Sequence, residues 1–297
     1  MLTAALIRQA GYGDEEPLVV GTRRTGSPPV FSAQGGLTAG TAVPIASLSK
    51  QITAACVALL VQQGRLDTAS TLGEWLPELP AWAHGVRVQH LLNHTSGLPE
   101  LTGFWDDFLT TPARTAADVI RALTAADGLV GPPGTEFRYC SVGYLCLAVV
   151  IHRASGQRLT EFARAHIFEP LGMATSHYLS DVAGDGGVQS TAEELMRWNQ
   201  AIERDELGVA ELLHTPGRLN DGTPLVYGWG IDILEHKGQP LHKHGGRWPG
   251  VSTQLGRLPN RGAGFVILAL DDDEARTVRL MNALIEDLGR DGQDTQR

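Results

Sequence analysis

The chain has 297 residues, of which 42% are hydrophobic and 19% charged. This composition excludes a chain kept disordered by charge and low hydrophobicity, and the length allows about two domains or one large domain. The formal net charge of −9 leaves no basic surface to neutralise phosphates, so we expect no nucleic-acid partner. The cysteines, Cys56, Cys140 and Cys146, are an odd number at scattered spacing, which favours free thiols over a disulfide framework.

The N-terminus shows no export pattern. Residues 1–8 lack the basic start and the longer apolar stretch of a signal peptide. The longest apolar run, Leu145 to Ile151, is far shorter than the roughly 20 residues that cross a bilayer. We therefore expect a soluble, cytoplasmic protein with no membrane partner.

The first elements in chain order are a hairpin and a long helix. Residues 17–24 and 29–34 are β-rich runs, and the short turn between them predicts a hairpin. From residue 47 to 63 the apolar residues recur at helical spacing, and Gly64 supplies the stop. We expect the apolar stripe of this helix to lie on a sheet.

The section from about residue 66 to 216 is predicted to be mostly helical, because its shorter periodic segments are broken by glycine and proline. The pattern around Thr191 fits a capping box with Glu194, which fixes the start of the last of these helices. The expected helices span residues 113–126, 141–154, 160–168 and 191–202.

β patterning returns after Pro216, and a helix at residues 274–288 closes the chain. The expected strands span residues 225–234, 240–244, 251–258 and 263–270. Strands at both ends with helices between them predict an α/β (α+β) fold, in which an antiparallel sheet is flanked by helices and carries an inserted, mostly helical domain. The predicted limits are 1–66 plus 217–297 for the sheet domain and 67–216 for the helical domain.

Ser47 and Lys50 form a candidate nucleophile and base. Residues three apart on a helix share a face, so the hydroxyl and the amine can meet. A serine hydroxyl must pass its proton to a base before it attacks, and a buried lysine favours the neutral form that can accept it. Only three lysines occur in the chain, and Lys50 is the only one in the first 236 residues. A capping serine followed by an exposed lysine is the alternative interpretation.

Tyr139 lies where the turn-rich residues 131–134 meet the helix expected to begin at Ser141. From that junction a phenol can reach into a cleft and relay protons between a serine, a lysine and a leaving group. The alternative interpretation is a half-buried core tyrosine.

His242 and His244 are expected on one face of a strand, followed by Gly245 and Gly246. One interpretation is a metal pair completed by His214 or His236. The other is a strand of the active site, in which His244 polarises a bound group and the glycines let a ligand approach the backbone. No spacing demands a third metal ligand, so we expect neither a metal nor another cofactor.

Taken together, ordered motifs in this chain resemble those of the serine β-lactamase and penicillin-recognising superfamily, near its class C β-lactamase-like branch. That branch includes D-alanyl-D-alanine carboxypeptidases, D-aminopeptidases and carboxylesterases, and it shares the Ser-x-x-Lys motif. The resemblance covers residues 30 to 288. Its blocks are residues 45–50 (IASLSK), 91–99 (LLNHTSGLP), 133–139 (PGTEFRY), 169–173 (EPLGM), 186–191 (GGVQST) and 244–246 (HGG).

The resemblance implies a catalytic set of four side chains. Ser47 would be the acylated nucleophile, Lys50 would help to deprotonate it, and Tyr139 would be the partner acid and base. His244 stands where the family's third motif has lysine or histidine. The second motif usually reads Tyr-x-Asn, and Ser141 replaces the asparagine here.

The same resemblance implies how substrate would be held. The oxyanion hole would come from the backbone N–H groups of Ser47 and Arg247. Arg247 could also pair with a substrate carboxylate, and aromatic residues would rim the cleft. The candidate binding residues are thus Ser47, Ser141, Gly245, Gly246, Arg247, Trp105 and Trp248.

These residues predict a serine hydrolase that acts on a small ester, amide or peptide. The absence of an export pattern favours an esterase or amide hydrolase over a β-lactamase or D,D-carboxypeptidase, which remain alternatives. A non-catalytic sensor with the same fold is the rival from another class, and Ser141 is its best support. A metallohydrolase that uses His242 and His244 is the third. The oligomeric state is left open.

Overall fold

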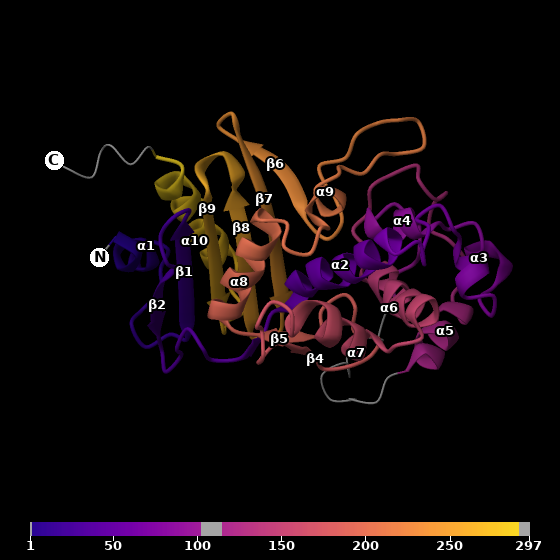
Figure 1. Ribbon diagram of the computed structural model, residues 1–297, viewed down its shortest axis with the longest axis horizontal. Helices are drawn as coiled ribbons and strands as arrows, with labels where there is room; N and C mark the ends of the chain where they lie inside the picture. Colours follow the sequence, from indigo (N-terminus) through magenta and orange to yellow (C-terminus); the bar gives the residue numbers. More distant parts are fainter. Residues whose placement is uncertain (1, 102–114, 291–297) are drawn as a thin grey trace.

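An antiparallel sheet joins the two ends of the chain (Figure 1). The computed structural model describes residues 2–101 and 115–290, and within them this sheet has six strands in the order β2-β1-β9-β8-β7-β6. The central pairing of β1 with β9 brings residue 18 opposite residue 269. The strands are β1 (Leu18–Arg24), β2 (Val30–Gln34), β6 (Asp232–His236), β7 (Gln239–Trp248), β8 (Val251–Leu258) and β9 (Ala263–Ala269).

The predicted hairpin and the C-terminal strands are confirmed, with one correction. β6 begins at Asp232, whereas the sequence pattern placed a strand from residue 225. Gly230 is the physical reason. It has a φ of 72°, and a Cβ there would lie 2.6 Å from the Lys50 carbonyl oxygen. The chain must therefore turn tightly against the helix of Lys50 before it can extend as a strand.

Helices cover both faces of the sheet. α1 (Leu2–Gln9) and α10 (Glu274–Leu288) pack together on one face, where they meet Leu18 and Val20. α8 (Ala192–Glu203) packs across β1, β8 and β9 on the other face, and Val19 lies in the core on this side. Alternate residues of one strand thus enter two different cores, as the pleat requires.

α2 (Ser49–Gln62) runs through the middle of the molecule, between the sheet and the helical end (Figure 1). It packs mainly against α6 (Ser141–Ser155), α7 (Leu159–Ala163) and α9 (Ala210–Leu213). The expectation that its apolar stripe lies on a sheet is wrong. Its residues are buried on nearly every side. The sequence predicted an amphipathic helix on a sheet, whereas α2 is a buried helix that packs mainly against other helices.

The predicted helices of the middle section are present where the structure describes them, although the helix expected from residue 113 begins at Ala116 and residues 113–114 lie outside the described part. The helix expected at 160–168 continues beyond α7 as a π-helical turn. The other elements are α3 (Leu72–Trp75), α4 (Val88–Leu92), α5 (Ala116–Thr124), a small sheet of β3 (Val43–Pro44), β5 (Val188–Ser190) and β4 (His177–Tyr178), and 3-10 turns at Ala46–Leu48, Ala81–Ala83 and Pro259–Arg261.

Only half of the predicted capping box at α8 forms. The Thr191 side chain accepts from the Glu194 N–H at 3.1 Å, as expected. The Glu194 carboxylate instead accepts from the Ser176 hydroxyl at 2.6 Å and from the Thr175 N–H at 2.9 Å. A tertiary contact has therefore replaced the local one.

The predicted domain limits stay a prediction. α8 belongs to the segment 67–216 by sequence, yet it covers a face of the sheet. Among the residues described, 2–101 and 115–290, none of the helices combines the length and apolar character that a bilayer crossing needs.

Candidate active site

Ser47 lies in the 3-10 turn Ala46–Leu48, directly before α2. Ala46 has a φ of 49°, a conformation that L residues other than glycine rarely adopt. The turn is held in place because the Ser49 hydroxyl donates to the Ala46 carbonyl at 2.7 Å and the Thr253 hydroxyl donates to the Ile45 carbonyl at 3.0 Å. The neighbourhood of Ser47 is thus strained and fixed, as is common at functional sites.

Lys50 is fully buried, and its amine lies beside the Ser47 hydroxyl. The distance from Nζ to Ser47 Oγ is 3.2 Å. Nζ also lies 3.3 Å from Ser141 Oγ and 2.9 Å from the backbone oxygen of Asp185. The structure therefore brings together the predicted site residues Ser47, Lys50 and Ser141, and each of these hydrogen bonds of the amine is made to an oxygen.

Asp185 is a site residue that the sequence reasoning missed. It is buried, and burial raises the pKa of its carboxyl to about 6, against the opposing effect of the Lys50 charge. Its carboxylate Oδ1 has no hydrogen-bond partner among the described residues. The only signal in the sequence was its place directly before the glycines of residues 186–191.

Tyr139 stands over the amine of Lys50, with its ring centroid 4.9 Å from Nζ. Its side chain is half-exposed, and the ring packs at 4.2 Å on that of His94, a second missed residue. The Cys140 N–H donates to His94 Nδ1 at 3.1 Å. Burial, and after it the nearby charge of Lys50, hold the pKa of His94 well below its usual value. The ring that packs against Tyr139 is therefore neutral.

His244 is buried, and both of its ring nitrogens are engaged by the protein. Nδ1 lies 2.6 Å from the Gly245 carbonyl, which can only accept, so Nδ1 carries the proton. Nε2 then accepts from the Tyr227 hydroxyl at 3.0 Å. Burial lowers the pKa of His244 to about 4, so the ring is neutral at pH 7. Tyr227 is a third missed residue, and no motif in the sequence marks it.

The glycines after His244 let β7 approach the serine turn. A Cβ on Gly246 would lie 2.6 Å from the Ile45 carbonyl oxygen, so only glycine fits against this turn. The pairing of β6 with β7 ends at Lys243. From His244 to Trp248, β7 therefore pairs with β8 on one side and has none of the described strands on the other. This open edge faces the turn of Ser47, although the oxyanion role of the Ser47 and Arg247 N–H groups stays a prediction.

A cavity of about 620 Å³ opens above Ser47. Two of the predicted binding residues, Gly246 and Trp248, do not line this cavity. Gly246 instead packs against the serine turn. A third, Trp105, lies outside the described residues. Charged and polar side chains form part of the wall away from the serine, including an ion pair between Lys243 Nζ and Asp232 Oδ2 at 2.9 Å. The lining residues are Ser47, Phe137, Tyr139, Ser141, Asp232, Lys243, His244, Gly245, Arg247, Gln254, Glu274, Val278 and Met281.

The histidines proposed as metal ligands do not all come together in the described part of the structure. His242 stacks on His214, whereas His244 bonds to Tyr227 and His236 pairs with Glu286. Throughout residues 2–101 and 115–290, no group of three or more His, Cys, Asp or Glu side chains could hold a metal ion.

Comparison with known proteins gives a consistent result. A family model described as Beta-lactamase matches residues 13–290. Penicillin-binding protein 4* of Bacillus subtilis (strain 168) is 30% identical over 281 residues, which cover 77% of this chain and 61% of the relative. The D-aminopeptidase of Brucella canis is 27% identical over 293 residues, or 86% of this chain and 55% of the relative. The chain thus spans little more than half the length of these relatives.

Solved structures share the fold. The penicillin-binding protein from Bacillus halodurans superimposes with a TM-score of 0.80 at 23% identity, over 96% of this chain and 99% of that protein. The predicted fold class, an antiparallel sheet flanked by helices in the β-lactamase and transpeptidase arrangement, is therefore confirmed.

Proposed function

Because the chain belongs to the Beta-lactamase family, a family of serine hydrolases, we propose that it forms an acyl-enzyme on Ser47 and releases it with water. The observation that carries this proposal is the 3.2 Å contact between Ser47 Oγ and the buried Nζ of Lys50. The amine has Ser47 Oγ, Ser141 Oγ and the Asp185 carbonyl within hydrogen-bonding distance, and so it is next to the hydroxyl whose proton it must accept.

In the acylation step, Lys50 takes the hydroxyl proton as Ser47 Oγ attacks the carbonyl carbon of the substrate. The negative charge that develops on the carbonyl oxygen is stabilised by the N–H groups of Ser47 and Arg247. Collapse of the tetrahedral intermediate breaks the C–N or C–O bond, and the proton passes through Tyr139 to the leaving amine or alcohol. Water then attacks the acyl-enzyme with the proton transfers reversed. Both ring nitrogens of His244 are hydrogen-bonded to the protein, so this residue holds its part of the cavity wall in a fixed position.

We propose a small, polar ester, amide or peptide as the substrate. The charges of Asp232, Lys243 and Glu274 in the cavity wall suit a polar group better than a long apolar chain. The guanidinium of Arg247 in the same wall suits a substrate carboxylate. The names of the relatives, a penicillin-binding protein and a D-aminopeptidase, support amide chemistry. The buried free thiols of the three cysteines accord with a cytoplasmic location, which we include in the proposal.

Intact-protein mass spectrometry after treatment with a fluorophosphonate tests the acyl-enzyme. We expect one adduct on the folded protein, its loss in Ser47→Ala, and its retention in Ser27→Ala, which removes an exposed serine from a turn. A folded wild-type protein without an adduct would contradict the proposal.

The substrate class is tested by hydrolysis rates on four compounds. These are a short p-nitrophenyl ester, nitrocefin, a D-Ala-D-Ala peptide and a D-amino-acid amide. We expect turnover of the ester or the amide. Binding of one of these compounds without turnover, equally tight in Ser47→Ala, would instead favour the non-catalytic sensor.

A further inference from the structure

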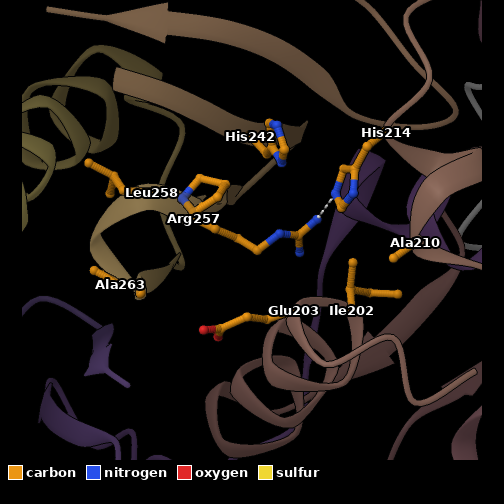
Figure 2. Close-up of a pocket in the computed structure, with 10 residues that line it drawn as sticks. Ile202, Glu203, Ala210, His214, His242, Arg257, Leu258 and Ala263 are labelled. Carbon is orange, nitrogen blue, oxygen red and sulfur yellow. Dashed lines mark hydrogen bonds between the residues drawn. The ribbon is translucent and has the colours of Figure 1, made fainter. Parts of the chain in front are cut away.

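A second cavity, of about 280 Å³, lies on the α8 side of the sheet (Figure 2). It shares no lining residue with the cavity above Ser47. Its wall is formed by residues of α8, of α9 and the position after it, and of the strands β7, β8 and β9. They include Ile202, Glu203, His214, His242 and Arg257.

Arg257 brings a positive charge into this cavity without a negative partner. Its side chain crosses the space between the helices and the strands in Figure 2, and only 5% of the residue is exposed. One terminal nitrogen donates to Asn199 Oδ1 at 3.2 Å, and the other lies 2.6 Å from His214 Nε2. Within the described ranges no carboxylate forms an ion pair with it. Buried charges are costly unless paired, and three of the five guanidinium N–H donors remain for another acceptor.

The two histidines of the cavity are neutral and add unused hydrogen-bonding capacity. Because His214 Nε2 accepts from Arg257, it carries no proton, and its ring stacks on that of His242 at a centroid distance of 4.3 Å. Burial and the Arg257 charge lower the pKa of His214 to about 3 and that of His242 to about 4. His242 Nδ1 is buried and has no hydrogen-bond partner among the described residues.

Glu203, the carboxylate among the described lining residues, does not neutralise this charge. It forms an ion pair with Arg23 and accepts from the Thr25 hydroxyl at 2.8 Å. The cavity wall near Arg257 therefore keeps a net positive charge, although the chain as a whole is acidic.

We propose that this cavity binds a small oxyanion, namely inorganic phosphate or the phosphate group of a small monoester, which pairs with Arg257 next to His242. A guanidinium presents parallel N–H groups that match two oxygens of such an anion. The cavity is large enough for a phosphate group and too small for a long chain. This site is independent of the hydrolase chemistry proposed above.

Isothermal titration of the whole chain with inorganic phosphate, glycerol phosphate and acetate tests the site. We expect saturable 1:1 binding of a phosphate compound and weaker binding of acetate, which has a single charge. Tighter binding of glycerol phosphate identifies a monoester as the ligand, and tighter binding of inorganic phosphate identifies the free ion. Absence of saturable phosphate binding, or acetate binding of equal strength, overturns the proposal.

Two variants locate the binding. Arg257→Gln should raise Kd about 10- to 100-fold, because a charge-assisted pair is lost, whereas Arg121→Gln, which removes an exposed charge, should leave Kd unchanged. Asn199→Asp keeps Arg257 and places a carboxylate beside its guanidinium, at the cost of the hydrogen bond from Asn199 to the Gly256 carbonyl. This internal anion should compete with phosphate and raise Kd at least tenfold. If Arg257→Gln does not fold, unchanged affinity in folded Asn199→Asp overturns the proposal.

Discussion

The two cavities lie along the same strand, yet of the two only the first has an ion pair between its described lining residues. β7 supplies His244 to the first and His242, two residues earlier on the same face, to the second. In the first, the Lys50 amine is surrounded by three oxygens, and Lys243 pairs with Asp232. In the second, Arg257 has only neutral partners.

The difference accords with the two proposed roles. Hydrogen bonds that hold the Lys50 amine among three oxygens keep the reacting atoms in place, as an acyl-transfer site requires. A buried charge that the protein leaves unpaired instead favours any ligand that can pair with it.

The largest effect is expected from Lys50→Met. It removes the base and its three hydrogen bonds, so kcat/KM for a p-nitrophenyl ester should fall about 10²–10⁴-fold. Thermal unfolding checks that the variant is folded, because methionine leaves the Asp185 carbonyl oxygen without its lysine donor. The matched control is Lys237→Met, which removes an exposed lysine paired with Glu286 and should keep full activity. Activity of Lys50→Met within tenfold of wild type would show that Lys50 is not the base.

The next largest effect is expected from Gly246→Ala. The new Cβ would press against the Ile45 carbonyl and the Thr253 hydroxyl, so the serine turn must move away from β7. We expect a loss of about 1–3 kcal/mol in the free energy of unfolding, measured in urea, and a clear fall in kcat. Gly85→Ala is the control, because nothing lies within 4 Å of its Cβ position. Equal behaviour of the two variants would contradict the close approach.

A smaller effect is expected on the pH dependence of stability. Burial lowers the pKa of His242 to about 4, below the usual value near 6.5, so the unfolded chain takes up this proton first as the pH falls. His214 and His244 act in the same direction, whereas Asp185, with its raised pKa, acts oppositely. Tm should therefore fall between pH 6.5 and 4.

His242→Gln isolates one of these contributions. The decline in Tm should become shallower by about 1–3 °C per pH unit, as differential scanning calorimetry would show. His177→Gln, at an exposed position, is the control. An unchanged slope in His242→Gln would mean that the pKa of this ring is the same in the folded protein as in the unfolded chain.

The smallest effect on activity is expected from Arg257→Met. Ester hydrolysis should stay within about threefold of wild type, because the two cavities share no residue, and Tm should not fall, because an unpaired buried charge is removed. Ester kinetics and thermal unfolding in phosphate-free buffer check both expectations. A large loss of ester hydrolysis in this variant would show that the two cavities do not act independently.

Local patterns predicted the elements well. The closing helix at 274–288, the strand at 251–258 and the helix that begins at Ser141 were all readable from periodicity, because their signals lie within one segment. The strand expected from residue 225 failed at Gly230, since the reason for that turn is the backbone of Lys50, which is far away in sequence. The capping box failed for a similar reason, because Ser176 attracts the Glu194 carboxylate.

The pairing of Ser47 with Lys50 could be derived from the sequence alone, because a spacing of three residues brings these two side chains together on a helical turn. The residues that surround this pair are set by the packing of distant segments. Asp185, His94 and Tyr227 come from separate loops, and their pKa values and hydrogen bonds depend on burial that no local pattern encodes. The same holds for Arg257, whose unpaired charge becomes visible only when α8, α9 and the sheet close around it, because burial is a property of packing rather than of residue type.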